Sequence, residues 1–165
     1  MIELEPITPT NAQVYKNLRL RALLDSPTAF SSTYADAAKL SDDDWLQRAA
    51  HWSSRAAVAY LAIDAGDAVG MAAGVLGVND PRRAELLSMW VAPSHRRSGI
   101  GRLLVDTIAA WARARNVLHL YLSVTSNNDQ AIQFYRSLGF TLTDRRETYP
   151  NDPALCNLAM LRALT

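Results

Sequence analysis

Hydrophobic and polar positions along the chain follow two periods, and each period predicts one kind of element. Alternating or short apolar runs bounded by turn residues predict strands over residues 2–7, 57–63, 68–78, 84–91, 117–124, 140–148 and 155–164. Apolar residues three or four apart, with capping residues before them, predict helices over residues 10–24, 41–53, 99–115 and 128–138. The pattern over residues 28–40 is ambiguous.

The order of these elements predicts a mixed sheet. Three consecutive strands between residues 57 and 91 are joined by short turns, which favour antiparallel pairing. The strand–helix–strand unit over residues 84–124 predicts one parallel pair with a right-handed crossover. We therefore expect one sheet with helices on its faces and a single domain spanning residues 1–165.

Composition narrows the class of protein. The 165 residues are 49% hydrophobic and 20% charged, which suits one domain with a substantial core. The net charge of +1 argues against binding nucleic acid or an anionic membrane through bulk charge. The purest apolar stretch, residues 56–63, is too short to span a bilayer, and the N-terminus does not have the pattern of a signal peptide. A lone Cys156 and three scattered histidines favour no disulfide and no metal site, so we expect a cytoplasmic protein without a metal.

Candidate chemistry lies where the strand over residues 84–91 leads into a turn and a helix. Gly99 and Gly101 remove Cβ atoms where backbone N–H groups would approach a ligand. The first N–H groups of a helix are unpaired and carry partial positive charge, which together favour a phosphate or pyrophosphate. Residues 93–115 contain five arginines and one acidic residue, a local balance of +4.

Three known kinds of phosphate-binding loop lie between a strand and a helix, as this turn does. A Walker loop requires Gly-Lys-Ser/Thr at the helix start, and no lysine is present there. A dinucleotide fingerprint requires a third glycine, where the chain has Leu104, and a later acidic residue, which residues 117–128 lack. The third pattern, Arg96-x-x-Gly99-x-Gly101, resembles the coenzyme A pyrophosphate loop of the GNAT superfamily of acetyl-CoA-dependent N-acetyltransferases.

A second motif supports this resemblance. Some thirty residues later, a helix resembles the second conserved motif of the same family, Asn128-x-x-Ala131-x-x-Phe134-Tyr135-x-x-Leu138-Gly139-Phe140. The resemblance covers essentially the whole chain. It implies an α+β fold, an α/β/α sandwich whose mostly antiparallel seven-stranded sheet contains one parallel, splayed pair, with about four helices. One departure is Arg97, where family members often have glycine.

The resemblance also implies which residues bind the cofactor, acetyl-CoA acting as co-substrate. Backbone groups of the strand would contact the pantetheine arm, the loop and helix start would hold the pyrophosphate, and an asparagine would contact the pantetheine. These residues are Met89, Val91, Arg96, Arg97, Ser98, Gly99, Ile100, Gly101, Arg102 and Asn128. Asn128 has an alternative role as a helix N-cap.

The catalytic residues implied by the resemblance are Tyr135 and Glu85. Tyr135 would protonate the departing thiolate, and its alternative role is that of a core aromatic residue. Glu85 would accept the proton of the amine, and its alternative role is that of a solvated carboxylate beside Arg82 and Arg83. His119 is a weaker candidate for the base, because its side chain is expected to face the helices.

Together these features favour an N-acetyltransferase that moves the acetyl group of acetyl-CoA directly to an amine. The acceptor is an amine of a small molecule, a peptide or a protein, and the sequence does not choose between them. The alternative function is a non-catalytic acyl-CoA-binding or sensor module. Homodimers are common in the family, and the sequence leaves the oligomeric state open.

Overall fold

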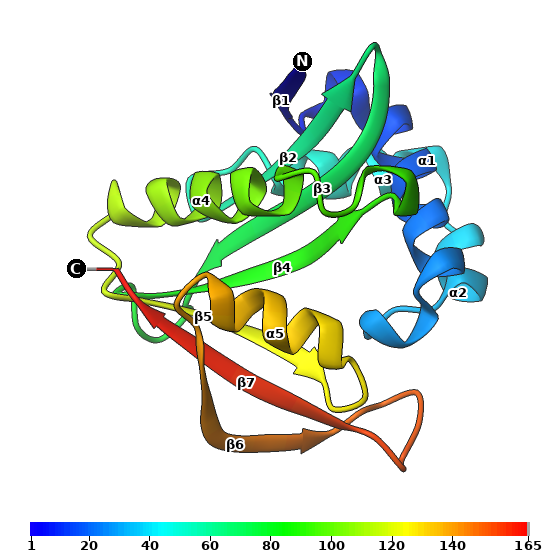
Figure 1. Cartoon of the computed structure of the whole chain (residues 1–165). Helices are drawn as coiled ribbons and strands as arrows, with labels where there is room; N and C mark the ends of the chain where they lie inside the picture. Colours follow the sequence, from blue (N-terminus) through cyan, green and yellow to red (C-terminus); the bar gives the residue numbers. More distant parts are fainter. Residues whose placement is uncertain (165) are drawn as a thin grey trace.

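Seven strands form one mixed sheet in the computed structural model, which describes residues 1–164 (Figure 1). Their order across the sheet is β1-β2-β3-β4-β5-β7-β6. Their bounds are β1 (Ile2–Pro6), β2 (Ala57–Asp64), β3 (Asp67–Leu76), β4 (Arg83–Val91), β5 (His119–Thr125), β6 (Thr141–Thr148) and β7 (Cys156–Ala163). β4 and β5 pair in parallel and every other neighbouring pair is antiparallel, which confirms the expected mixed sheet.

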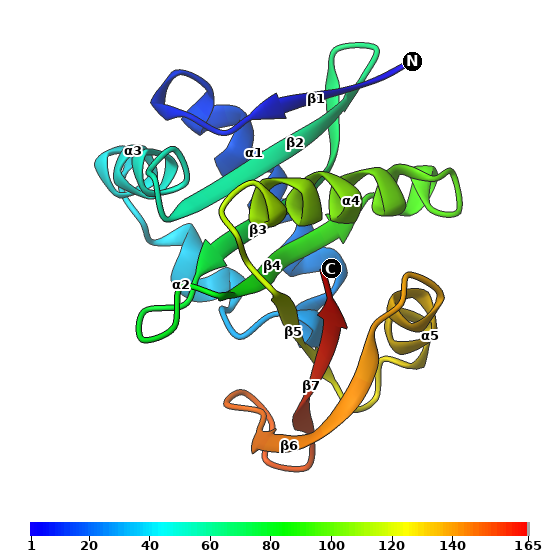
Figure 2. The same cartoon turned by 90° about the vertical axis from the view of Figure 1, so that its left-hand side faces the viewer.

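Helices cover both faces of this sheet (Figure 2). They are α1 (Ala12–Asp25), α2 (Tyr34–Ala38), α3 (Asp42–His51), α4 (Ile100–Arg113) and α5 (Asp129–Ser137). α4 and α5 lie on one face and α1 to α3 on the other. The short α2 occupies the stretch whose pattern was ambiguous, so residues 1–164 contain five α-helices where about four were expected. None of these helices is long and apolar enough to cross a membrane.

Small residues on β3 allow α4 to lie close against the sheet. A Cβ atom at Gly74 would lie 2.9 Å from Cγ2 of Ile108, and one at Gly70 would lie 3.4 Å from Cδ1 of Leu104. The apolar stripe of α4, which includes Leu104 and Ile108, is fully buried against the sheet. This packing fixes the direction of α4, and therefore the place of its N-terminus beside the end of β4.

The parallel pair is short, and its strands then separate. β4 pairs with β5 only over Arg83–Glu85, opposite His119–Tyr121. Beyond Glu85, β4 continues beside β3 while β5 continues beside β7, so a gap opens between them on the right of Figure 1. A β-bulge contributes to this separation: Ser88 has a φ of +55° and lies with Met89 opposite a single residue of β3. The predicted splayed pair is confirmed.

A segment from the N-terminal half of the chain, residues 27–31, is held by the C-terminal half. The hydroxyl of Tyr149 donates to the carbonyl oxygens of Phe30 and Pro27. The amide of Asn151 donates to the carbonyl of Ser31 at 2.9 Å, and the hydroxyl of Thr125, at the end of β5, donates to the carbonyl of Thr28. We call residues 27–31 with these partners the clasp. It joins the two halves of the chain where β4 and β5 do not pair.

Candidate functional site

The N-terminus of α4 is open to a ligand. Gly99 precedes the helix with a φ of +88°, and no side chain caps the helix start. The first helical hydrogen bond runs from the N–H of Leu103 to the carbonyl of Gly99 at 3.0 Å, which leaves the N–H groups of Ile100, Gly101 and Arg102 without a helical acceptor. A Cβ atom at Gly99 would meet no atom within 4 Å. The geometry is that of an anion site built from backbone donors.

The side chain of Arg96 stabilises this loop through hydrogen bonds. Its Nε donates to the carbonyl of Val91 at 2.9 Å, and its Nη2 donates to Oδ2 of Asp25 at 2.7 Å. The indole Nε1 of Trp90 donates to the same carboxylate oxygen at 3.0 Å. Partial burial acts to raise the pKa of Asp25, but the hydrogen bonds from Ser26, Trp90 and Arg96 outweigh it and hold that pKa below its ordinary value. Asp25, at the end of α1, therefore remains a carboxylate. In this form it holds the loop through its hydrogen bonds with Arg96 and Trp90.

A second contact holds the loop at its other side. Nε2 of His95 lies 2.8 Å from Oδ2 of Asp64, at the end of β2, and Nδ1 of His95 lies 2.8 Å from the hydroxyl of Ser94. The hydroxyl of Ser98 donates to the carbonyl of His95. Arg97 adopts a φ of +61° in the same turn, and its side chain is exposed. A bulky cation is thus accommodated where family members often have glycine.

Gly101 has a different role from the one expected. A Cβ atom there would lie 2.9 Å from Cζ of Phe134 and 3.2 Å from Cε of Met89. The missing side chain therefore makes room for α5 and β4 to pack against α4. The expectation that the missing Cβ makes room for a ligand is therefore wrong, since that space is taken by Phe134 and Met89. The N–H of Gly101 is still one of the donors without a helical acceptor.

The edge of β4 faces the gap with unpaired backbone groups. The N–H of Ala92 donates to the carbonyl of Val69 in β3 at 2.8 Å. Since successive residues of a strand direct their N–H groups to opposite edges, the N–H groups of Val91 and Met89 point away from β3 and toward the gap. The carbonyl of Val91 is occupied by Arg96. This edge can hydrogen-bond an extended ligand.

Helix α5 contributes two of the predicted residues. Oδ1 of Asn128 accepts from the N–H of Ala131 at 3.1 Å, so its alternative role as N-cap is confirmed, and its side-chain NH₂ makes no hydrogen bond to any described residue. Tyr135 is 8% exposed and packs beside Phe134 and Phe140, with ring centroids 5.2 and 5.7 Å away. Burial raises the pKa of Tyr135 well above its usual value, which keeps the phenol protonated.

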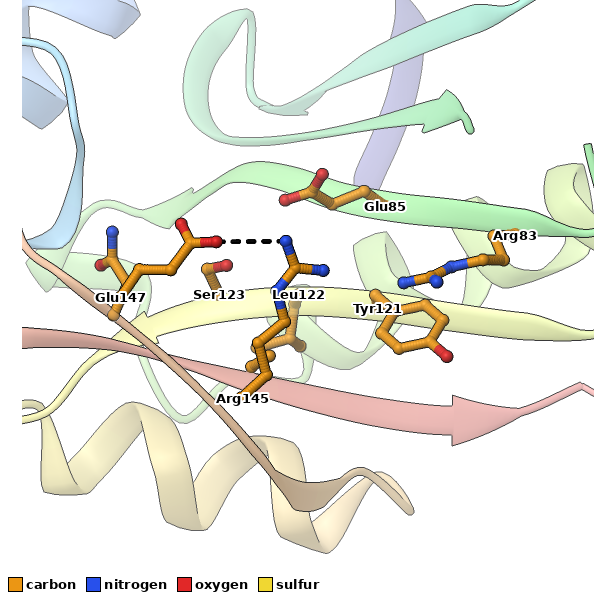
Figure 3. A pocket seen from close by; sticks show the side chains of 9 residues that line it. Arg83, Glu85, Tyr121, Leu122, Ser123, Arg145 and Glu147 are labelled. Atoms are coloured by element: carbon orange, nitrogen blue, oxygen red, sulfur yellow. Dashed lines mark hydrogen bonds and ion pairs between the residues drawn. The ribbon is translucent and has the colours of Figure 1, made fainter. Parts of the chain in front are cut away.

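Glu85 lies in a polar cavity on the opposite face of the sheet (Figure 3). The cavity has a volume of about 210 Å³ and is lined by Arg83, Glu85, Tyr121, Leu122, Ser123, Arg145, Glu147, Asn157 and Ala159. Burial raises the pKa of Glu85; Glu147 acts in the same direction, whereas Arg145 and Arg83 oppose it. A carboxylate with a raised pKa is suited to accept a proton near neutral pH.

His119 does not face the helices as expected. Its side chain is exposed, and its ring lies 6.5 Å from that of Tyr121, on the face that carries the cavity. It is absent from the lining of the cavity that contains Glu85. This placement favours Glu85 over His119 as the base.

Comparison with known proteins identifies the architecture. The model of the acetyltransferase (GNAT) family matches residues 20–140. The chain belongs to this family. It is 42% identical over 82 residues to the streptothricin acetyltransferase of Streptomyces lavendulae, covering 49% of this chain and 43% of that protein. It is 40% identical over 68 residues to the ribosomal protein bS18 alanine N-acetyltransferase of Salmonella typhimurium, covering 41% and 46%. The chain thus spans less than half the length of these relatives.

A solved structure shows the same fold over nearly the whole chain. The PaiA N-acetyltransferase of Thermoplasma acidophilum, determined in complex with coenzyme A, superposes with a TM-score of 0.78 at 17% identity and covers 99% of both chains. At this identity the similarity establishes the GNAT fold. The matched family and the two named relatives are acetyltransferases.

The GNAT fold brings the predicted residues into two groups. Backbone donors of the loop, the α4 N-terminus and β4 lie along the gap, together with α5, while Glu85 lies on the other face. Sequence reasoning missed Asp25, Arg145 and Glu147, which come from segments with no motif. The local signal was a run of four charged residues over 144–147. Arg145 and Glu147 line the cavity, and the other two do not.

Proposed function

We propose that this GNAT protein transfers the acetyl group of acetyl-CoA directly to an amine of a small molecule, a peptide or a protein. One observation carries the proposal: the gap between β4 and β5 opens beside the uncapped N-terminus of α4. A long ligand with a pyrophosphate at one end and an amide-rich arm at the other matches this combination of an anion site and an unpaired strand edge.

The residues present fit such a ligand. The N–H groups of Ile100, Gly101 and Arg102, together with the backbone of the loop at Arg96, Arg97, Ser98 and Gly99, would hold the pyrophosphate. The N–H groups of Met89 and Val91 would pair with the pantetheine amides, as would the free NH₂ of Asn128. Because Asp25 and Val91 occupy the guanidinium of Arg96, this side chain supports the shape of the loop.

Acetyl-CoA supplies an acetyl group activated as a thioester. Glu85 would take the proton of the acceptor ammonium, directly or through water, so that the amine nitrogen has a free lone pair. The C–N bond forms at the carbonyl carbon, and a backbone N–H of β4 near the bulge would stabilise the oxyanion. The C–S bond then breaks, and Tyr135 would protonate the thiolate. The ammonium nitrogen loses two protons: one passes to solvent through Glu85, and the second returns to the phenolate of Tyr135. The products are the amide and the free thiol.

The acceptor cannot be carried over from the named relatives. One acts on streptothricin and the other on an alanine of a ribosomal protein, and the chain spans less than half of each. The family match over residues 20–140 includes the loop at residues 96–101, and this loop does not identify an acceptor.

Binding of coenzyme A tests the proposal directly. At a hundredfold excess over its dissociation constant, linkage adds about 2.7 kcal/mol to the free energy of unfolding. For a chain of this size, that raises Tm by roughly 5–10 °C. A folded sample whose Tm does not move at millimolar coenzyme A would contradict the assignment.

A second measurement separates the enzyme from an acyl-CoA sensor. Free thiol release from acetyl-CoA across a panel of amines, with the acetylated product detected by mass, identifies transfer. Tight binding without any acetylated product would favour the non-catalytic alternative.

A further inference from the structure

The cavity around Glu85 contains cations as well as carboxylates. Arg83 and Arg145 lie on the same face as Glu85 and Glu147, so the four charges sum to zero (Figure 3). A pocket that selected simple amines or polycations would carry negative charge alone. The two arginines therefore require an explanation beyond attraction of an ammonium group.

Arg83 has no ionic partner among the described residues. Its guanidinium lies over the ring of Tyr121, 4.0 Å from the centroid, which fixes its orientation. Its neighbour Arg82 pairs with Asp80 at 3.4 Å outside the cavity, and within residues 1–164 no carboxylate lies within 4 Å of Arg83 itself. The planar donors of Arg83 are thus oriented and available to an anion.

Arg145 is paired, but its partner is easily exchanged. Nη2 of Arg145 lies 3.1 Å from Oε1 of Glu147, and the two side chains are 67% and 63% exposed. Ion pairs this exposed contribute little to stability. An anion entering the cavity can therefore draw Arg145 away from Glu147 at little cost.

The spacing of the charges sets the shape of the ligand. Arg83 and Glu85 are two residues apart on one strand, and their Cα atoms are therefore about 6.6 Å apart on the same face. Glu85 is the nearer of the two to the gap. An acceptor whose amine faces Glu85 and the thioester would direct its other end toward Arg83.

We propose that the acceptor is a small amino acid-like molecule, in which a carboxylate a few ångströms from the amine is bound by Arg83 and Arg145. This inference rests on the proposed function. A volume of about 210 Å³ suits a compact molecule and lies below the range of drug-sized ligand pockets. Guanidinium groups bind carboxylates through paired N–H donors, which gives both affinity and orientation. Acetylation removes the positive charge of the ammonium and leaves the carboxylate, so the product loses its attraction to Glu85 and can leave.

The test compares each acid with its neutral amide. Glycine, β-alanine and 4-aminobutyrate, and the amide of each, are offered with acetyl-CoA, and kcat/KM is measured from the acetylated product. The wild-type chain should prefer at least one acid over its amide by about tenfold or more. The preferred chain length reports the distance between the amine site and Arg83.

Variants of Arg83 then locate the preference. Arg83→Gln should reduce the ratio of acid to amide to within about threefold, and Arg83→Lys should retain part of it. Arg83→Glu should favour 1,4-diaminobutane over 4-aminobutyrate. Arg82→Gln is the matched control, since Arg82 lies outside the cavity, and it should keep the wild-type ratio. The thermal shift with coenzyme A confirms that each variant is folded.

The outcomes are distinguishable. Equal use of acids and amides by the wild-type chain, or a preference that survives in Arg83→Gln, would overturn this inference while leaving acetyl transfer in place. Acetylation of no amine would overturn the proposed function, and the inference with it.

Discussion

Glu85 and Tyr135 lie on opposite faces of the sheet, and β4 stops pairing with β5 at Glu85. Glu85 projects from β4 into the polar cavity, whereas Tyr135 is buried under α5 among aromatic rings. The environment raises the pKa of both groups. A raised pKa makes a carboxylate a better base, which suits the proposed role of Glu85. For Tyr135 it keeps the phenol protonated and also makes it a weaker acid.

Replacing Glu85 should produce a loss of activity that depends on pH. Glu85→Gln should reduce turnover mainly below pH ~8, because an amide cannot take the ammonium proton, and the amine loses that proton unaided as the pH rises. The measurement is the ratio of mutant to wild-type rates from about pH 6.5 to 9.5. A ratio that does not change over this range would remove Glu85 from the role of base.

The same variant should not be destabilised. Because the pKa of Glu85 is raised in the folded chain, the folded state holds this proton more tightly, and the free energy of unfolding falls as the pH rises through the folded-state pKa. Glutamine does not ionise, so the variant does not show this fall in the free energy of unfolding. We expect Glu85→Gln to melt at or above the wild-type Tm at pH 8, which separates a catalytic defect from unfolding.

Replacing Tyr135 should affect the chemical step. Tyr135→Phe should lower kcat by about 10²–10³-fold with little change in KM for acetyl-CoA, because in the proposed role the phenol would act only as the C–S bond breaks. Its hydroxyl has no hydrogen-bond partner among the described residues, so the variant should stay folded. Tyr60→Phe, on β2, is a matched control. If chemistry limits turnover and the Tyr135 variant keeps more than about half of kcat, water is the proton source.

At the scale of the element, Gly99 and Gly101 at the N-terminus of α4 look equivalent in the sequence but have different surroundings in the structure. Gly99 has a positive φ and open space at its Cβ position, whereas Gly101 lies against Phe134. Valine at Gly101 should therefore overpack the contact between α4 and α5 and cost about 1–3 kcal/mol of stability, apart from any effect on binding.

Gly99 allows a cleaner test, because Gly66 is a natural control. Both glycines have a φ of +88° and no atom within 4 Å of a Cβ position, but Gly66 lies in the turn between β2 and β3. Gly99→Val and Gly66→Val should therefore suffer similar backbone strain. Only Gly99→Val should weaken binding of coenzyme A, measured by calorimetry. Equal affinities in the two variants would show that Gly99 serves the turn alone.

Local sequence patterns predicted the elements well, and they predicted the side-chain partners poorly. Caps, turn residues and periodicity are properties of neighbouring residues, so each predicted strand and helix is present with ends shifted by three residues or fewer. The short α2 was missed because its five residues carry too little periodicity. The contact between Asp25 and Arg96 joins residues 71 apart, and no local pattern reveals such a pair. For the same reason the role of Gly101 was misjudged: the ring it faces belongs to another helix.

At the scale of the whole molecule, the chain is divided by the gap and rejoined by the clasp. Only three residue pairs link β4 to β5, while Tyr149, Asn151 and Thr125 bind residues 27–31 across the opening. The network around Asp25 lies immediately before this segment. The loop at residues 93–99, the end of α1 and the clasp are thus linked to one another, and they come from parts of the chain that are far apart in sequence.

The bulge and the divergence of β4 place an unprotected backbone edge in the middle of a seven-stranded sheet. In deuterium exchange, the amides of Met89 and Val91 should label quickly, as at the rim of a sheet, while the amide of Ala92, bonded to Val69 at 2.8 Å, should label slowly. Coenzyme A should slow the first two and leave the third unchanged. Slow labelling of Met89 and Val91 in the free chain would mean that the gap is closed in solution. Residue-resolved exchange would thus show how far the interior of this sheet remains in contact with water until a ligand completes it.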